Sequence, residues 1–195
     1  MIRDILLIQK RELEKRLKEN YIERNVNSKK IGNMINVIIG PRRAGKSFFA
    51  IHILNKLGNF GYVNFDDEKL VEIKDYNEII NAVNSLYNNP KYLLFDEIQN
   101  LDKWELFVNR LQRQDYNIII TGSNSKLLSK ELATHLTGRH LLTTIFPFSF
   151  KEFLKLENKE LTNNEIKEKL LYYLTYGGYP EPLLKKLDYK DYLST

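Results

Sequence analysis

Short apolar runs alternate with amphipathic stretches along this chain, and the alternation predicts the order of its strands and helices. Continuous apolar runs are typical of strands buried on both faces, and the expected strands cover residues 37–39, 61–65, 92–95, 117–121 and 140–145. Apolar residues at spacings of three and four predict helices over residues 48–54, 76–87, 104–111 and 127–136. The βαβαβαβαβ order predicts an α/β fold with a five-stranded, mainly parallel sheet and helices on both faces.

Two further segments flank this predicted core. Between Ile2 and Leu17 apolar residues recur at helical spacing, so we expect an N-terminal amphipathic helix whose apolar stripe packs on the core. After residue 145 the strand pattern stops and the sequence becomes helical. The expected organisation is a basic helix and connection (1–32), a core (33–145) and a small helical region (146–195).

Composition excludes several classes of protein. The 195 residues are 43% hydrophobic, which is enough for a real core, and contain neither a long apolar segment nor a signal-peptide pattern. We therefore expect a cytoplasmic protein without a membrane segment. The absence of cysteine excludes disulfides, thiolate zinc sites and cysteine nucleophiles, and none of the three histidines is paired at ligand spacing.

The net charge of +5 is concentrated at the N-terminus. Residues 1–32 carry nine basic and five acidic residues. A basic helix of this kind suits nucleic acid or an acidic partner, whereas a solvated face with charges of both signs explains it equally well. Both interpretations stay open.

The main chemical signal lies between the first strand and the helix that follows it. Residues 40–47 match the phosphate-binding pattern G-x-x-x-x-G-K-[ST], in which glycines let the backbone wrap around a phosphate. Lys46 is expected to contact the phosphates, and Ser47 to bind Mg²⁺. Arg42 and Arg43 either touch phosphate or face solvent or an acid. The candidate phosphate-binding residues are Gly40, Pro41, Arg42, Arg43, Ala44, Gly45, Lys46, Ser47 and Phe48.

A second part of the site is expected at the end of the third strand. Asp96 follows a buried apolar run, the usual position of a carboxylate that holds Mg²⁺ through water. Its neighbour Glu97 is the candidate general base for activating a water. The alternative is a solvated acidic turn, which we consider less consistent with the preceding phosphate loop.

Polar residues near the fourth and fifth strands complete the candidate set. Ser123 or Asn124 would lie beside Asp96 if their strands are neighbours, and either side chain suits contact with water or phosphate, although turn formation explains them equally well. Arg139 is a candidate for neutralising charge on phosphate, in its own subunit or a neighbour, with a structural ion pair as the alternative.

Seven blocks of the sequence carry a resemblance to a known family. They are GPRRAGKS (40–47), YVNFDD (62–67), LFDEIQ (94–99), TGSNS (121–125), GR (138–139), PFSFKEF (147–153) and YGGYPE (176–181). With these blocks the chain resembles the AAA-type ATPases of archaea and bacteria, related to the STAND/MNS branch of P-loop ATPases. The resemblance implies an AAA+-like three-layer sandwich with a helical lid, ATP and Mg²⁺ as ligands, Ser123 or Asn124 as a sensor, and Arg139 acting on phosphate.

The chain departs from the family pattern at its C-terminal end. No arginine follows Arg139, so the lid arginine of many AAA+ proteins is missing unless Lys185 or Lys186 replaces it. Family members commonly continue into another domain, so we expect that one is missing here.

The leading functional hypothesis is Mg²⁺-dependent ATP hydrolysis coupled to a conformational change that acts on a macromolecular partner, in a monomer or homo-oligomer. The alternatives are a nucleotide-dependent switch with slow turnover, possible DNA association through the basic helix, and a small-molecule kinase. The Asp96 and Glu97 pair favours water over a kinase acceptor.

Overall fold

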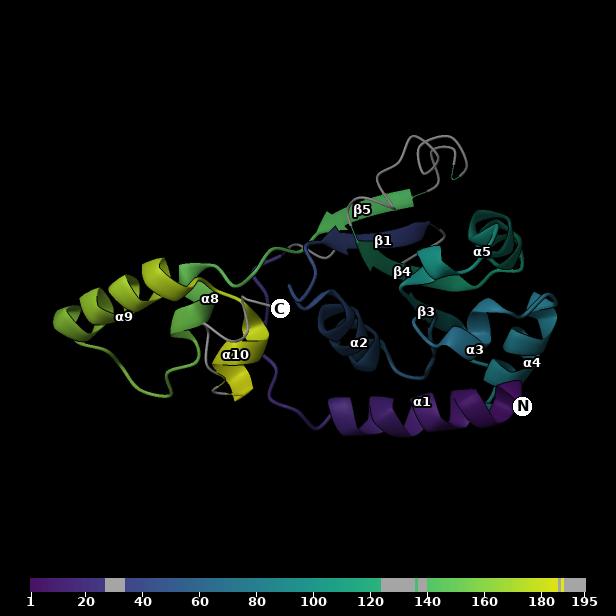
Figure 1. The fold of residues 1–195 in the computed structure, drawn as a ribbon, viewed down its shortest axis with the longest axis horizontal. Helices are drawn as coiled ribbons and strands as arrows, with labels where there is room; N and C mark the ends of the chain where they lie inside the picture. Colours follow the sequence, from purple (N-terminus) through teal and green to yellow (C-terminus); the bar gives the residue numbers. More distant parts are fainter. Residues whose placement is uncertain (27–33, 124–135, 137–139, 186, 188–195) are drawn as a thin grey trace.

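The computed structural model describes residues 1–26, 34–123, 136, 140–185 and 187. At its centre is a five-stranded sheet in the order β2-β3-β4-β1-β5, in which every neighbouring pair is parallel (Figure 1). The strands are β1 (Ile35–Gly40), β2 (Phe60–Asn64), β3 (Tyr92–Asp96), β4 (Asn117–Ser123) and β5 (His140–Thr144). The predicted α/β fold with a five-stranded parallel sheet is confirmed.

The helices expected over residues 48–54, 76–87 and 104–111 are present, together with others. They are α1 (Ile2–Arg16), α2 (Lys46–Leu57), α3 (Glu68–Val71), α4 (Tyr76–Tyr87), the 3₁₀ helix η1 (Ile98–Asn100), α5 (Trp104–Arg113), α8 (Phe150–Leu154), α9 (Asn163–Tyr176) and α10 (Pro180–Lys185). The short helix α3 was not expected; the Asp67 side chain caps it by accepting a hydrogen bond from the Lys69 N–H. The helix expected over residues 127–136 lies outside the described residues, apart from Leu136, which is buried.

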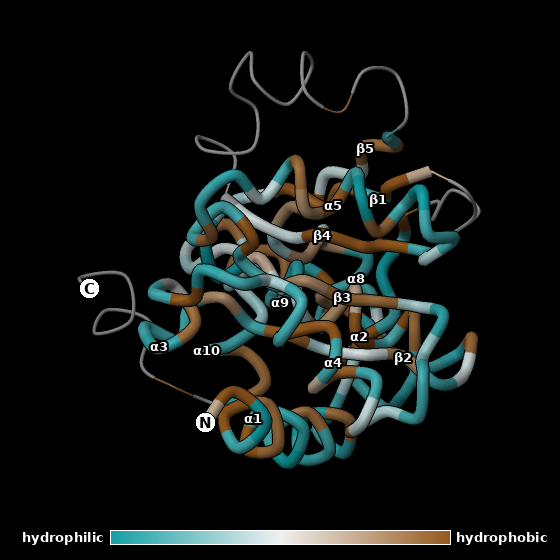
Figure 2. Tube along the Cα trace, turned by 90° about the vertical axis from the view of Figure 1, so that its right-hand side faces the viewer, coloured by the Kyte–Doolittle hydropathy of each residue, from teal (hydrophilic) through white to brown (hydrophobic). Residues whose placement is uncertain are grey.

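The core lies between the sheet and its helices. All six residues of β1 are buried, and the side chains of Val63, Leu94 and Phe95 on neighbouring strands are fully buried. From α2, Ile51 and Leu54 pack onto the same core. Figure 2 shows the strands β3 and β4 as largely hydrophobic segments at the centre. A parallel sheet covered by helices requires such continuous apolar strands, which explains the pattern in the sequence.

Helix α1 packs against α4 and β2, as its apolar stripe predicts. The side chains of Leu6 and Leu13 are buried in this contact. Gln9 adds a polar attachment, because its amide donates to the backbone oxygen of Asn64 at 3.0 Å and accepts from the Asn64 N–H at 2.9 Å. Among the described residues, no helix combines the length and the apolar content that crossing a membrane requires.

The helices α8, α9 and α10 lie together beyond one end of the sheet (Figure 1). Phe148 and Phe153 are buried there, whereas Phe146 is 63% exposed. Two backbone-directed hydrogen bonds tie the segments together: the Phe148 N–H donates to the Gly178 oxygen at 2.7 Å, and the Tyr173 hydroxyl donates to the Phe148 oxygen at 2.7 Å. Both bonds join the backbone of Phe148 to the chain around the end of α9.

Candidate functional site

The loop between β1 and α2 has the backbone that the glycine pattern predicts. Gly45 has φ 89° and stands immediately before the first turn of α2, where a side chain would be strained. At Gly40 a Cβ atom would lie 1.9 Å from the backbone oxygen of Ile145, so only glycine fits against the chain that follows β5. The loop is thus fixed at both ends, and it leads into a helix N-terminus, which favours anions.

Lys46 is the buried cation of this loop. The residue is only 5% exposed, and its ammonium donates a hydrogen bond to the backbone oxygen of Pro41, in the same loop, at 3.0 Å. Burial lowers the pKa of Lys46, and the opposing effects of Glu97 and then Asp96 only partly offset this. The ammonium is therefore poorly solvated, and its hydrogen-bond partner within the described residues is a neutral carbonyl, a setting that favours contact with an anion.

Asp96 ends β3 and gathers hydroxyl groups from three different elements. One carboxylate oxygen accepts a hydrogen bond from the Ser47 hydroxyl at 2.8 Å and another from the Thr121 hydroxyl, and the second oxygen accepts one from the Tyr62 hydroxyl at 3.2 Å. Asp96 is 3% exposed. The predicted pair of Ser47 and Asp96 is thus in direct contact, because the β3 and β1 strands end on the same side with only β4 between them.

Tyr62 extends this arrangement to the N-terminal helix. Arg16 Nη1 lies 3.2 Å from the Tyr62 hydroxyl oxygen and donates to it, while the same hydroxyl donates to Asp96. Burial, followed by the charge of Asp96, raises the pKa of Tyr62, so the hydroxyl keeps its proton. Asp96 is therefore held from α1 as well as from the sheet.

Glu97 takes a left-handed backbone conformation, with φ 51° and ψ 43°, directly after β3. Its N–H donates to the Thr121 hydroxyl at 3.2 Å, and its carboxylate accepts from Gln99 Nε2 at 2.6 Å. The strand end therefore presents Asp96 inside the protein and Glu97 at the cavity.

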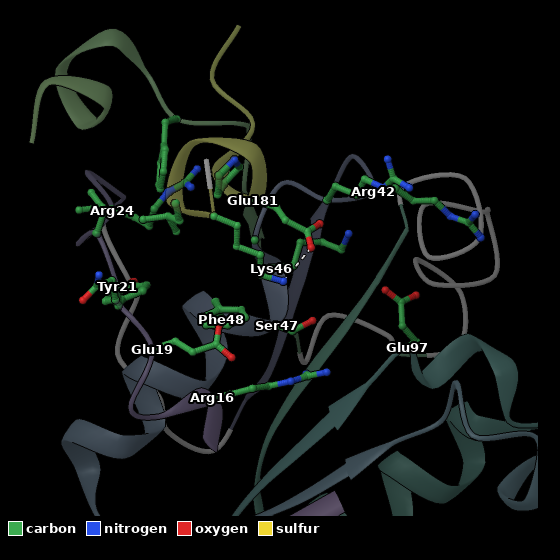
Figure 3. Close-up of a pocket in the computed structure, with 18 of the residues that line it drawn as sticks. Arg16, Glu19, Tyr21, Arg24, Arg42, Lys46, Ser47, Phe48, Glu97 and Glu181 are labelled. Atoms are coloured by element: carbon green, nitrogen blue, oxygen red, sulfur yellow. Dashed lines mark hydrogen bonds and ion pairs between the residues drawn. The ribbon is translucent and has the colours of Figure 1, made fainter. Parts of the chain in front are cut away.

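A cavity of about 870 Å³ is lined by Lys46, Ser47, Glu97 and Gln99, and Asp96 lies behind Ser47, to which it is hydrogen-bonded (Figure 3). In the figure, Lys46 and Ser47 lie between Glu97 on one side and Tyr21 and Arg24 on the other. The cavity is lined by residues of the segments 16–24, 42–48, 97–100 and 180–185 together with Asp66 and Phe148. It thus joins the loop to α1, to η1 and to α10.

Arg24 connects the loop to the C-terminal helices. Its side chain is 4% exposed and its Nε lies 3.3 Å from a carboxylate oxygen of Glu152, whose side chain is 5% exposed. Arg24 also donates to the oxygens of Ala44, at 3.4 Å, and of Phe146, and it lies 4.7 Å from the centre of the Phe148 ring. One buried guanidinium therefore contacts the phosphate loop and the chain leading into α8.

The basic N-terminal segment uses part of its charge inside the protein. Lys10 donates to the Leu86 oxygen at 2.7 Å, and Arg16 and Arg24 make the contacts described above. The exposed positions Arg11 and Lys15 alternate with the acids Glu12 and Glu14. Within the described residues, the exposed face of α1 therefore carries charges of both signs.

The structure brings together Lys46, Ser47, Asp96 and Glu97, and it places Arg42, Arg43 and Phe48 on the cavity wall. Ser123 pairs with Gly40 in the sheet register, which puts its backbone beside the loop. Asn124 and Arg139 lie outside the described residues, as does Lys186. Lys185 does line the cavity.

Sequence reasoning missed several residues that contact the predicted ones. Tyr62 and Thr121 look like ordinary strand residues, and Arg24 lies in a turn-rich stretch. Only Thr121 gave a usable signal, because it is a polar residue near the carboxyl end of a strand. The contacts of Tyr62 and Thr121 with Asp96 become evident only when the order of the strands in the sheet is known.

The fold and this arrangement define a P-loop α/β protein. The AAA domain family matches residues 32–154, and this chain belongs to that family. The match covers the sheet and extends to the end of α8.

Two curated relatives and one solved structure are similar to the chain. An uncharacterized protein of Methanocaldococcus jannaschii is 46% identical over 198 residues, covering 93% of this chain and 45% of that protein. An uncharacterized protein of Haemophilus influenzae is 35% identical over 179 residues, covering 86% of this chain and 44% of that protein. The chain thus spans about half the length of these relatives. The Hsp104-ADP complex of S. cerevisiae shares the fold, with a TM-score of 0.56 at 13% identity over 92% of this chain and 30% of that one.

Proposed function

We propose that this chain binds ATP with Mg²⁺ and hydrolyses the nucleotide to change its conformation on a macromolecular partner. The observation that carries the proposal is the position of Lys46, Ser47 and Glu97 around one cavity, with Asp96 hydrogen-bonded to Ser47. Membership of the AAA domain family supports nucleotide as the ligand.

The phosphates fit between the loop and Lys46. A phosphate oxygen carries more charge than the Pro41 carbonyl that now accepts from the Lys46 ammonium, so the lysine exchanges this bond for a stronger one. The loop amides and the N-terminus of α2 add further donors. Beyond the phosphates, Tyr21, Ile22, Pro180 and Leu184 offer apolar surface for a nucleoside.

The oxygens present suit Mg²⁺. The Ser47 hydroxyl and the Asp96 carboxylate are hard ligands of the kind this ion prefers, directly or through water. Among the described residues no group of three or more acids or histidines is able to hold a metal alone, so phosphate oxygens would complete the coordination. Bound Mg²⁺ would neutralise charge on the phosphates during the reaction.

Glu97 is the proposed base for the hydrolytic step. A water oxygen forms a bond to the γ-phosphorus while the bond from that phosphorus to the bridging oxygen breaks, which releases ADP. Glu97 accepts the proton of the attacking water, and Lys46 stabilises the charge on the phosphate oxygens. Ser123 or Asn124, and Arg139, keep their expected roles as sensor and as charge-neutralising arginine.

The direct test compares ATP turnover and nucleotide affinity in the wild type, Glu97→Gln, and Glu12→Gln as a control at an exposed position of α1. We expect Glu97→Gln to lower kcat by roughly 100-fold or more, with nucleotide Kd nearly unchanged. Equal turnover in all three proteins would reject Glu97 as the base.

A nucleotide-dependent switch with slow turnover is the second candidate, favoured by the contact of Arg24 with both Ala44 and Glu152. It predicts that protease cleavage between α8 and α10 differs between ATP-bound and ADP-bound protein even where turnover is negligible. The same cleavage pattern in both states would exclude it.

A further inference from the structure

The turn after Asp96 holds a glutamine whose position the hydrolytic step above does not explain. Gln99 lies in η1, and its Nε2 donates to Glu97 Oε2 at 2.6 Å. Both residues line the same cavity. This is a short bond between an amide and a carboxylate two residues apart, and bonds to ionised groups are stronger than neutral ones.

The turn that carries Gln99 is firmly attached to the protein. Ile98 is fully buried and Leu101 is 2% exposed, so apolar side chains fix η1 on both sides of Gln99. Asn100 also donates to the Phe65 oxygen at 3.3 Å and to the Asp66 carboxylate at 2.8 Å. Gln99 therefore reaches Glu97 from a rigid support, as a positioning residue must.

The orientation of the Gln99 amide satisfies its nitrogen but not its oxygen. Within the described part of the chain, Gln99 Oε1 is buried and has no hydrogen-bond partner. Turning the amide over would place that oxygen against the Glu97 carboxylate, which is repulsive. A buried acceptor left without a donor is unfavourable and needs an explanation, and here the contact with Glu97 provides it.

The direction in which Glu97 is held points toward the reaction site. Figure 3 shows Glu97 on one side of Lys46 and Ser47, and all three residues line the cavity. The carboxylate of Glu97 thus lies at the same cavity as the proposed phosphate-binding lysine, and Gln99 bonds to one of its oxygens, Oε2. The other oxygen remains to accept a proton.

We infer that Gln99 is a positioning residue that holds the Glu97 carboxylate toward the phosphate site, so that one oxygen is ready to take the proton of the attacking water. This inference rests on the proposed hydrolysis at Glu97. Gln99 exchanges no proton, and its effect on the rate passes through Glu97.

The kinetic test uses Gln99→Met, which keeps the length of the side chain and removes the amide, with Gln114→Met at an exposed position after α5 as the matched control. We expect kcat to fall roughly 10- to 100-fold in Gln99→Met while KM and nucleotide Kd stay within about twofold. In the Glu97→Gln background the same change should have no further effect. An additive loss in the double variant, or a rise in kcat for Gln99→Met, would overturn the inference.

A structural readout separates this inference from the proposed function. In crystal structures of wild type and Gln99→Met, we expect Glu97 to face Lys46 only when Gln99 is present. An unchanged Glu97 in Gln99→Met would contradict the positioning role even if ATP is hydrolysed. Failure of the wild type to hydrolyse ATP would instead count against the proposed function, whatever orientation Glu97 takes.

Discussion

The sheet and the C-terminal helices of this protein are stabilised in different ways. All six residues of β1 are buried, and Asp96 at the end of β3 is held by hydroxyl groups from three elements far apart in sequence. Helix α9, by contrast, has no buried residue, and its N-terminus is fixed by its own capping box, in which Thr162 and Glu165 bond to each other's backbone. The sheet is a product of long-range packing, whereas α9 combines its own cap with contacts of partly exposed side chains, such as the hydrogen bond of Tyr173 to the Phe148 oxygen.

The difference in burial between the sheet and α9 indicates which parts of the protein tolerate movement. Regions with many buried apolar contacts unfold only with the whole domain, while regions held by local bonds open at lower cost. The sheet, whose strand β3 ends at Asp96, is of the first kind, and α9, which has no buried residue, is closer to the second. The buried pair of Arg24 and Glu152 forms the junction between the phosphate loop and the C-terminal helices.

The largest effect is expected at the loop itself. Gly40→Ala places a Cβ atom against the Ile145 oxygen, so the backbone of β1 or of the chain after β5 must shift. We expect a loss of about 4 kcal/mol or more in the free energy of unfolding, measured by urea denaturation. Gly177→Ala is the matched control, because Gly177 also has positive φ but an added Cβ would meet no atom within 4 Å. We expect this variant to lose about 1 kcal/mol in the free energy of unfolding. Equal losses would mean that the two regions are equally constrained.

An intermediate effect is expected at the junction. Glu152→Gln leaves the buried Arg24 without its counter-charge, so we expect a loss of about 3 kcal/mol in the free energy of unfolding. Glu157→Gln breaks the more exposed pair with Lys169 in the helical region and should cost about 1 kcal/mol or less. Similar losses in the two variants would remove the distinction between junction and surface.

The junction also predicts a pH dependence. Burial alone raises the pKa of Glu152, but the Ser149 and Asn25 N–H groups together with Arg24 hold it below its ordinary value of 4.5. A carboxylate with a lowered pKa in the folded state stabilises the protein above pH 4.5, and this contribution is lost as the pH falls below that value. Unfolding curves at a series of pH values should therefore converge for wild type and Glu152→Gln in acid. Parallel curves down to low pH would contradict the assignment.

The smallest effect is expected on α9. Leu171 is 66% exposed and Leu174 is 70% exposed, so changing both to Gln should alter the free energy of unfolding by about 0.5 kcal/mol or less. Leu54→Ala in α2, where the side chain is fully buried, should cost about 2 to 5 kcal/mol in the same assay. A large loss from the α9 changes would show that this helix contributes to the core after all.

Sequence reasoning predicted the parts of the site that depend on strand order and local pattern. The phosphate loop and Asp96 each follow an apolar strand, and strands of a parallel sheet end at one edge, so their proximity was predictable. The contact of Tyr62 with Asp96 was not, because a tyrosine in an apolar strand looks like a core residue. The pair of Arg24 and Glu152 joins segments separated by the whole sheet, and neither residue stands in a local pattern that indicates its partner. The hydrogen bond from Gln99 to Glu97 depends on the left-handed backbone conformation of Glu97, which no pattern in the sequence predicts.

The attachment of α1 at Asn64 has a consequence for association between copies of this protein. β2 is the last strand on its side of the sheet, and an outer strand with free N–H and C=O groups is a template for pairing with another chain. The Gln9 amide occupies both backbone groups of Asn64, and so takes the place that an incoming strand would need. At this end of β2, α1 therefore blocks the pairing of another strand.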